Sequence, residues 1–460
     1  MEVGVHLIEN LIIFINRILW GWPLIGFILI TGLYFSIKLG ILRFSRLKLA
    51  MKYVFEKDEG EGDISVFASL CTALSATVGT GNIVGIAVAV TCGGPGVIFW
   101  LWMSSIVSFA IKYSEGVLAI KYRLCGRDRK MCGGPMYYIS IGLHSKPYSQ
   151  FLAKIFAICG ILVALIGIGT LAQSNSIAVA LESFGSSRIV ATILIFASVA
   201  AVILGGLQRI ASVSEKIVPV MTLFYIGASV IVLAMNFMTI PDVFTSIFKG
   251  AFSPEAILGG GCGVTVSKLA SIGVSRGIFS HESGLGSSAI ASATAQTNSP
   301  VKQGLVSMAG AMLSVLICTM TGLVLILTCH DTGLFSDACK LEGANLTSQA
   351  FDSGLSFVPI GKYIVDLGII LFAFTTIIGW SYYGEKCTQF VFGDNYVIPY
   401  KFLFLFFVVL GPFYKINIVF TLADIATGLM AIPNLIGIIG LRKVVISETK
   451  TFWSDLKLKT

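Results

Sequence analysis

Long apolar stretches separated by short charged loops dominate the pattern of residues along the chain. From Ile64 to Ile111 there is no Asp, Glu, Lys or Arg. A membrane-spanning helix needs about 20 apolar residues, so this stretch is long enough for two crossings. The turn signal CGGPG, from Cys92 to Gly96, divides it near its middle. We therefore predict two consecutive membrane-spanning helices here.

The same pattern over the whole chain predicts an all-α polytopic membrane protein. Apolar runs bounded by charges, glycine or proline give about eleven spans. They cover residues 20–40, 66–91, 97–120, 152–180, 188–207, 217–239, 264–294, 304–329, 362–390, 398–413 and 417–441. Residues 1–18 are amphipathic rather than apolar, and we expect them to lie along the membrane interface.

Basic residues gather on one side of this predicted topology. Lysine and arginine are concentrated in the segments 43–57, 121–130, 209–216 and 442–459, whereas the loop 330–358 is mainly acidic. Short loops rich in Lys and Arg stay in the cytoplasm. The pattern therefore predicts an N-terminus outside the cell and a cytoplasmic tail at 442–460.

Composition supports the membrane interpretation. Hydrophobic residues make up 55% of the chain and charged residues 12%, with a mean hydropathy of +0.88, which excludes an ordinary soluble domain. The net charge of +8 forms no continuous basic face, so no nucleic-acid partner is expected. The ten cysteines include no C-x-x-C pair and indicate neither a zinc site nor a disulfide framework. For Cys329 and Cys339, a disulfide and two free thiols both stay open.

Two of the predicted spans carry residues that break helices. The span 66–91 contains Val78-Gly79-Thr80-Gly81-Asn82 at its middle. Glycine loosens a helix and exposes bare backbone groups, although small residues also allow close helix packing. Taken alone, this span does not distinguish the two explanations.

The second such span has glycines around a polar centre. Gly277, Gly284 and Gly286 surround the run Phe279 to Glu282. Free backbone groups in hydrocarbon cost several kcal/mol each, so a break of this kind is tolerated only where it lines a protein cavity. Two breaks five spans apart are typical of inverted repeats that share a binding site at the middle of the membrane.

The chemistry of such breaks suits a zwitterion. N–H groups of Gly79, Thr80 and Gly81 can bind a carboxylate, and carbonyls near Phe279 and Ser280 can accept from an ammonium.

Three polar side chains of the second span have more than one interpretation. Glu282 could bind a ligand or tie the unwound strand to a neighbouring helix. His281 could titrate or make a structural hydrogen bond. Arg276 could pair at an outer gate or pack in the cavity wall.

Six ordered blocks of sequence resemble the alanine or glycine:cation symporter family. They are SATVGTGNIVGIA (75–87), GGPGVIFWLW (93–102), GGPMYYI (133–139), AQSNSIA (172–178), SRGIFSHESGLGSS (275–288) and FAFTTIIGWSYYGEK (372–386). The resemblance implies a single transporter domain with a leucine-transporter-type fold. One extra helix (20–40) would precede two inverted repeats of five helices each, at 66–239 and 264–441. It also implies a multi-pass protein of a prokaryotic inner membrane, with no cofactor, and we expect a monomer in the lipid bilayer.

The resemblance also implies roles for individual residues. Gly79, Thr80 and Gly81 match a carboxylate-binding break, and Phe279 and Ser280 match the ammonium site and the side-chain wall. The remaining implied substrate residues are Asn82, Gln173, which is a polar pocket residue, and Trp380, which limits side-chain volume. Asn82 could also serve a second ion.

The implied sodium site joins two helices. The hydroxyls of Thr375 and Thr376 would lie beside the carbonyls of Ser75 and Val78, and sodium favours such oxygen ligands. Adjacent threonines in a membrane helix can instead bond back to their own helix.

Two departures from the family pattern leave the coupling ion open. His281 and Ser283 stand where the family usually has Asn and Ala, and Leu313 and Ser314 stand where an Asp-Thr pair is common. The leading hypothesis is sodium-coupled symport of alanine or glycine by alternating access, and the sequence does not choose between these two substrates. A proton-coupled or exchange carrier for another small amino acid is the alternative.

Two other function classes fit the sequence less well. An intramembrane enzyme would need partners for His281 and Glu282 that the sequence does not supply, so no enzyme is expected. A channel filter normally needs symmetric copies, and the two breaks differ in sequence.

Overall fold

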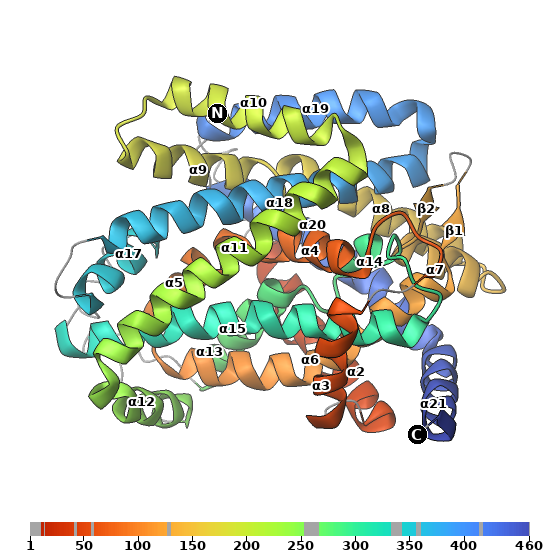
Figure 1. Cartoon of the computed structure of the whole chain (residues 1–460), viewed down its shortest axis with the longest axis horizontal. Coiled ribbons are helices and arrows are strands. Elements are labelled where there is room, and N and C mark those ends of the chain that lie inside the picture. Colours follow the sequence, from red (N-terminus) through yellow and green to blue (C-terminus); the bar gives the residue numbers. More distant parts are fainter. Residues whose placement is uncertain are drawn as a thin grey trace.

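The computed structural model is built almost entirely of helices (Figure 1). It describes residues 11–12, 14–40, 44–56, 59–126, 130–252, 266–332, 343–355, 360–413 and 417–459. Within these ranges one short antiparallel pair, β1 (Leu124–Cys125) and β2 (Met131–Cys132), closes a loop. The expected all-α class is therefore confirmed.

The helices of the segment 66–239 follow the predicted spans. They are α4 (Val66–Thr77), α5 (Val84–Gly93), α6 (Gly96–Lys121), α8 (Ser149–Ile166), α9 (Leu171–Ser183), α10 (Arg188–Ile203) and α11 (Gly206–Met235). The helix α4 begins where the Ser65 side chain accepts a hydrogen bond from Ala68 N, which satisfies an otherwise free amide of the first turn. The predicted span 152–180 is interrupted between α8 and α9, and α11 begins earlier than the predicted residue 217.

The helices of the segment 264–441 follow in corresponding order. They are α13 (Val266–His281), α14 (Ser287–Ser292), α15 (Pro300–Thr332), α18 (Gly361–Phe392), α19 (Val397–Leu410) and α20 (Asn417–Gly440). The helices α6, α13 and α15 pack on one another, and α14 packs on α4. The two broken crossings and their following helices thus form one bundle, while α18 packs on α8 and α9 beside it.

Short connecting helices show the inverted arrangement. The helix α7 (Pro135–Gly142) follows the second crossing of the first segment, and α17 (Gly343–Gly354) follows the second crossing of the other. These two helices lie at opposite ends of the molecule, at the right and left of Figure 1. Equivalent connections at opposite ends are what an inverted repeat requires.

The remaining helices surround this framework. They are α2 (Trp22–Leu39), α3 (Phe44–Phe55), α12 (Ile240–Phe252) and α21 (Arg442–Lys459). The helix α2 packs closely on α6, where a Cβ on Gly32 would lie 2.6 Å from the carbonyl oxygen of Val107. A helix that runs from Phe14 to Leu39 is long and apolar enough to cross a membrane. The expectation that residues 1–18 lie along the interface stays a prediction. Residues 1–10 lie outside the described residues, as does Cys339 of the predicted cysteine pair.

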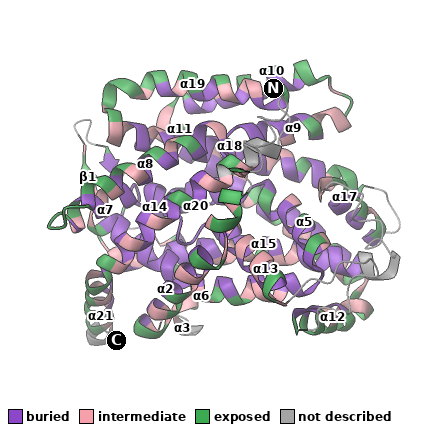
Figure 2. Cartoon of the chain, turned by 180° about the vertical axis from the view of Figure 1, so that it is seen from behind, coloured by how far each residue is buried: buried purple, intermediate pink, exposed green. Residues whose placement is uncertain are grey.

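By length and composition, seven helices of the described chain can cross a membrane, or up to nine if each bent pair is one span. The helix α10 is apolar but short, and the α13–α14 crossing is divided by its break. Large apolar side chains such as Leu223 and Ile30 are exposed on the outside of the helices, whereas the centre is buried (Figure 2). An exposed apolar surface around a closely packed interior is typical of a protein that faces lipid.

Candidate functional site

The first break divides α4 from α5. The helix α4 ends at Thr77, Val78 and Gly79 are extended, and Thr80 to Asn82 form a short 3₁₀ turn. The two flanking helices are bent by 66°. The predicted interruption around Gly79 is therefore confirmed.

Neighbouring helices hold this break on two sides. A Cβ on Gly79 would lie only 2.7 Å from Thr376 Oγ1 of α18, so a glycine is required by close packing. Thr80 Oγ1 donates to Gln173 Oε1 of α9 at 3.1 Å. The structure thus brings Gly79, Thr80 and Gln173 together, while Gly81 is exposed.

The second break follows α13. The helix ends at His281, and the backbone enters the left-handed region at Glu282 (φ 50°), Gly284 (φ 93°) and Gly286 (φ 80°) before α14 begins. The break therefore lies a few residues beyond the predicted centre at Phe279. Phe279 and Ser280 form part of the last turn of α13 instead of the unwound strand.

The carbonyls of that last turn have still lost their usual helical donors. Ser283 N donates to His281 Nδ1 at 3.1 Å, and Gly284 N donates to Glu115 Oε1 at 2.9 Å. The carbonyl of Ser280 accepts from Ser314 Oγ at 2.5 Å. The Phe279 carbonyl has lost its usual donor as well, because Ser283 N is directed to His281 Nδ1.

Asn82 joins the two broken crossings. Its Nδ2 donates to Ser280 Oγ at 3.1 Å and to Ser314 Oγ at 2.9 Å, and its Oδ1 accepts from Gly79 N at 3.3 Å. Ser280 Oγ also contacts Cys318 Sγ at 2.8 Å. These contacts place the first break beside the last turn of α13, which leads directly into the second break. The expectation that the two breaks share a binding site stays a prediction.

The residues predicted for sodium lie around the contact between α4 and α18, but not all of them face it. Thr376 Oγ1 lies 3.5 Å from the carbonyl oxygen of Val78 and also donates to Phe372 O. Ser75 Oγ donates to Thr72 O within its own helix. Thr375 bonds to Phe372 O and faces Met221 of α11 instead, so the structure joins Thr376 and Val78 and leaves Thr375 apart.

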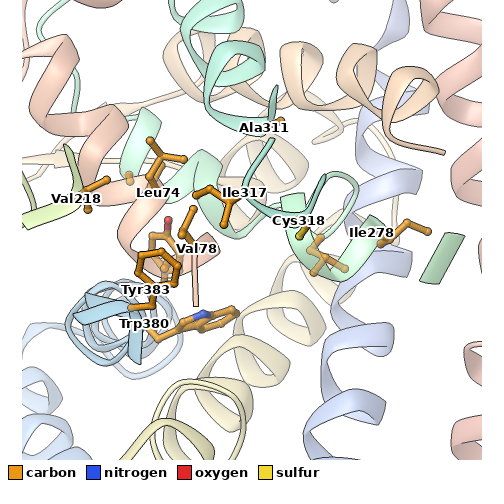
Figure 3. Packing of buried hydrophobic residues seen from close by; sticks show 14 of the residues in the cluster. Leu74, Val78, Val218, Ile278, Ala311, Ile317, Cys318, Trp380 and Tyr383 are labelled. Atoms are coloured by element: carbon orange, nitrogen blue, oxygen red, sulfur yellow. The ribbon is translucent and has the colours of Figure 1, made fainter. Parts of the chain in front are cut away.

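Trp380 is deeply buried beside the first break. Its side chain is 1% exposed, and it lies near Val78 and Tyr383 in the core (Figure 3). The rings of Trp380 and Tyr383 pack edge to face, with centroids 5.5 Å apart. In the described chain, Trp380 Nε1 has no hydrogen-bond partner. A bulky, rigid side chain therefore lies beside the first break, near Val78.

The sequence did not reveal an aromatic contact from the N-terminal helix. Trp20 packs on Phe279 with ring centroids 4.3 Å apart, and its Nε1 donates to the carbonyl oxygen of Asp424 in α20. Trp20 lies within the first apolar helix, and no local pattern marks it as a partner of a residue so far along the chain.

A second missed residue is Glu115 of α6. Its Oε1 accepts from Gly284 N, Gly286 N and Asn434 Nδ2, so it holds the second break in place. The available signal was the pair of charges, Lys112 and Glu115, within an otherwise apolar helix. Charged residues inside membrane spans are rare and point to function or to a specific structural tie.

Comparison with known proteins gives one consistent result. Residues 5–460 match the family model described as the sodium:alanine symporter family. The chain is 47% identical to an uncharacterized transporter of Haemophilus influenzae, covering 98% of this chain and 97% of that protein. It is 42% identical to the sodium/alanine symporter AgcS of Methanococcus maripaludis, covering 95% and 96%, respectively.

Two further comparisons concern a more distant relative and a solved structure. It is 35% identical to the probable sodium/glutamine symporter GlnT of Bacillus subtilis, covering 98% of this chain and 92% of that protein. The crystal structure of MhsT in complex with L-phenylalanine resembles it with a TM-score of 0.57 at 13% identity, over 82% of this chain and 89% of that chain. That likeness shows the leucine-transporter-type fold.

Proposed function

Because the chain belongs to the sodium:alanine symporter family, we propose that it carries a small neutral amino acid, alanine or glycine, together with sodium by alternating access. The observation that supports this best is the contact of Asn82 with the second broken crossing, where its Nδ2 donates to Ser280 of α13 and also to Ser314 of the following helix, α15. A sealed junction of two unwound crossings is where carriers of this fold type bind their substrates.

The substrate would lie between the two breaks. N–H groups of Gly79, Thr80 and Gly81 would bind its carboxylate, and the carbonyl of Phe279 would accept from its ammonium. Gln173 and Trp380 would bound the space for its side chain. An apolar pocket gains only about 1–3 kcal/mol per methylene, so larger side chains would be rejected by steric clash instead.

The sodium ion would lie where α18 meets the first break. The carbonyl oxygen of Val78 and the hydroxyl of Thr376 lie 3.5 Å apart there and would be its main ligands. Ser75 and Thr375 lie on the same two helices and would have to turn towards the ion. An ion that joins α4 to α18 would stabilise the geometry of Gly79 that the substrate needs. By reciprocity of binding free energies, the substrate would then raise the affinity for the ion.

The proposed setting is a monomer in a prokaryotic inner membrane, with the N-terminus outside and the tail inside. We propose no catalytic step. A second candidate, a proton-coupled or exchange carrier, is favoured by His281 and by Ser314, which occupy positions where the family pattern differs. The name of GlnT adds glutamine to the substrates to be tested.

Reconstituted vesicles test the proposal directly. Uptake of radiolabelled alanine, glycine, serine and glutamine is measured with a sodium, lithium or proton gradient. We expect alanine or glycine to accumulate only with the sodium gradient. Uptake that needs no cation would exclude symport, and uptake that follows only the proton gradient would support the second candidate.

A further inference from the structure

We propose that Lys112, Glu115 and Glu282 form a proton-binding site beside the second break, separate from the substrate and sodium sites. This proposal rests on the proposed function, because it adds a proton as a second ion to the proposed sodium-coupled transport. Two features of the structure indicate this site. The buried charges of the three side chains do not cancel one another, and small cavities lead from Lys112 towards one face of the protein.

Glu115 is the carboxyl group of the cluster with the most hydrogen-bond donors. Its Oε1 accepts three hydrogen bonds, from Gly284 N at 2.9 Å, Gly286 N at 3.1 Å and Asn434 Nδ2 at 2.8 Å. Three donors directed at one carboxylate oxygen stabilise its ionised form. Its other oxygen, Oε2, has no partner among the described residues.

Lys112 lies one helical turn from Glu115 on the same face of α6. Its side chain is 3% exposed, and its Nζ has no hydrogen-bond partner within the described part of the chain. Both Glu115 and Glu282 act on it electrostatically.

Glu282 is the second carboxyl group, and it lies at the start of the break. It is 2% exposed, and its Oε2 accepts a hydrogen bond from Ser287 Oγ. Lys112 and Glu115 are both within electrostatic reach of it.

With all three groups ionised, the charges of this cluster do not balance. Two carboxylates and one ammonium carry a net charge of −1, and a buried uncompensated charge is strongly unfavourable. A metal cation beside an ammonium would be repelled, whereas a proton on Glu282 makes the cluster neutral. On release, the O–H bond of the Glu282 carboxyl breaks, the proton passes to a water molecule, and the carboxylate remains.

Lys112 lines a cavity that can hold one water molecule of the route to the surface. It has about 10 Å³ of space for the centre of a water molecule, which is room for about one. Three atoms of its lining residues are buried and unpartnered within the described chain: Lys112 Nζ, Ser288 Oγ and Gln303 Oε1. Donors and an acceptor around one small space are what an ordered water needs.

A second cavity continues the route. Gln303 also lines a space of about 10 Å³ whose wall includes Glu56 and Lys302. Their ion pair is partly exposed, with Nζ 2.9 Å from Glu56 Oε1. Gln303 therefore separates two single-water cavities between Lys112 and the surface near Glu56.

Three other ionisable side chains, His281, Tyr138 and Tyr383, lie near the cluster. His281 Nδ1 accepts from Ser283 N, so this nitrogen carries no proton. Tyr138 of α7 donates to Asn434 Oδ1. Tyr383 of α18 is within electrostatic reach of both carboxyl groups. The cavity residues that α4 and α15 contribute carry no ionisable side chain.

Infrared difference spectroscopy of the full chain in lipid vesicles tests the site. We expect the C=O stretch of a protonated buried carboxyl group in the wild type, and its loss in Glu282→Gln. In Lys112→Met the same band should persist to higher pH, because the neighbouring positive charge no longer favours the carboxylate.

The matched control is Glu182→Gln, since Glu182 forms an exposed ion pair with Arg188. This variant should keep the band unchanged. A band that survives in Glu282→Gln would overturn the proposal. If Glu282→Gln does not fold, the pH dependence of the carboxyl band in Lys112→Met is the deciding measurement. A pH dependence equal to that of the wild type would overturn the proposal. The measurement needs no substrate, so a failure of alanine uptake and a failure of this site are separate results.

Discussion

At the scale of single residues, close packing around the first break explains why a glycine is found there. A Cβ on Gly79 would meet Thr376 Oγ1 at 2.7 Å, which is closer than real Cβ contacts come. The same threonine lies next to the carbonyl of Val78, so any shift of its hydroxyl changes the proposed ion site as well. One methyl group would therefore disturb the proposed substrate site and the proposed ion site together.

We expect Gly79→Ala to fold but to transport poorly. Overpacking of a well-packed site costs about 1–3 kcal/mol, which corresponds to a loss of sodium-dependent alanine uptake of about 5-fold to 150-fold. Uptake at several sodium concentrations measures it. The control is Gly227→Ala in α11, where an added Cβ meets nothing within 4 Å. Equal uptake by Gly79→Ala and the wild type would contradict the packing argument.

The sequence predicted some of these residues and not others, for a physical reason. Glycine and asparagine in the middle of an apolar span mark a break locally, so Gly79 and Asn82 could be identified. The direction in which Thr375 and Thr376 point depends on how α18 packs against α4 and α11, and no local pattern records that. The prediction that all four sodium residues share one site stays a prediction, with Thr375 directed towards Met221.

At the scale of helices, the two breaks form a single unit through Asn82. This side chain bonds to its own break at Gly79 N, to Ser280 of α13 and to Ser314 of α15. Removing it would leave buried polar groups on three segments with fewer partners.

Asn82→Ala should weaken substrate binding more than it weakens folding. Each buried group left without a partner costs about 1–3 kcal/mol, and here the groups belong to the proposed binding junction. The control is Asn175→Ala, because Asn175 is also a buried asparagine and donates to the carbonyls of Gly411 and Pro412. Thermal unfolding and radioligand binding are measured for both variants. An equal loss of binding in the control would show a general packing effect.

The position of the second break illustrates what sequence patterns miss. The glycines predicted an interruption near Phe279, but the backbone leaves the helix only at Glu282. Glu115, far away in sequence, accepts from Gly284 N and Gly286 N and so fixes where the strand unwinds. A tie between distant segments decides the boundary, whereas the glycines only permit it.

That tie makes Glu115 a structural requirement. Glu115→Ala would leave three buried donors without their acceptor, at about 1–3 kcal/mol each. We expect a large fall in the thermal unfolding midpoint and little folded protein. Glu115→Gln keeps an acceptor oxygen in the same place and should be much milder. Similar midpoints for the two variants would contradict this role of Oε1.

At the scale of the whole molecule, one arginine joins two segments that are far apart in the sequence. Arg123 was interpreted in the sequence only as part of a basic loop that indicates orientation. In the structure its guanidinium donates to four carbonyl oxygens, those of Glu61, Ala293, Ala295 and Thr297. It therefore ties the segment before α4, where the first broken crossing begins, to the segment after α14, where the second broken crossing ends.

The amides between these two segments report on that tie. Asp63 N donates to Thr294 O, and Gln296 N donates to Ile64 O, each at 2.8 Å. Alternating access requires these two segments to separate when their face of the protein opens, because the two crossings would otherwise stay joined. Arg123 would then set how often the separation occurs.

We expect Arg123→Ala to open this face more often. Hydrogen bonds from a charged donor contribute about 1.5–3 kcal/mol each, so losing several should raise the open population about tenfold or more. Hydrogen–deuterium exchange at Asp63 and Gln296 should become faster by a similar factor. The exchange rates of Arg123→Lys should fall between those of the wild type and Arg123→Ala, since an ammonium cannot reproduce the planar fork of donors. The control is Arg188→Ala, which also removes one positive charge but from an exposed ion pair with Glu182. Unchanged exchange in Arg123→Ala would mean that the backbone bridge, and not the guanidinium, keeps the face closed.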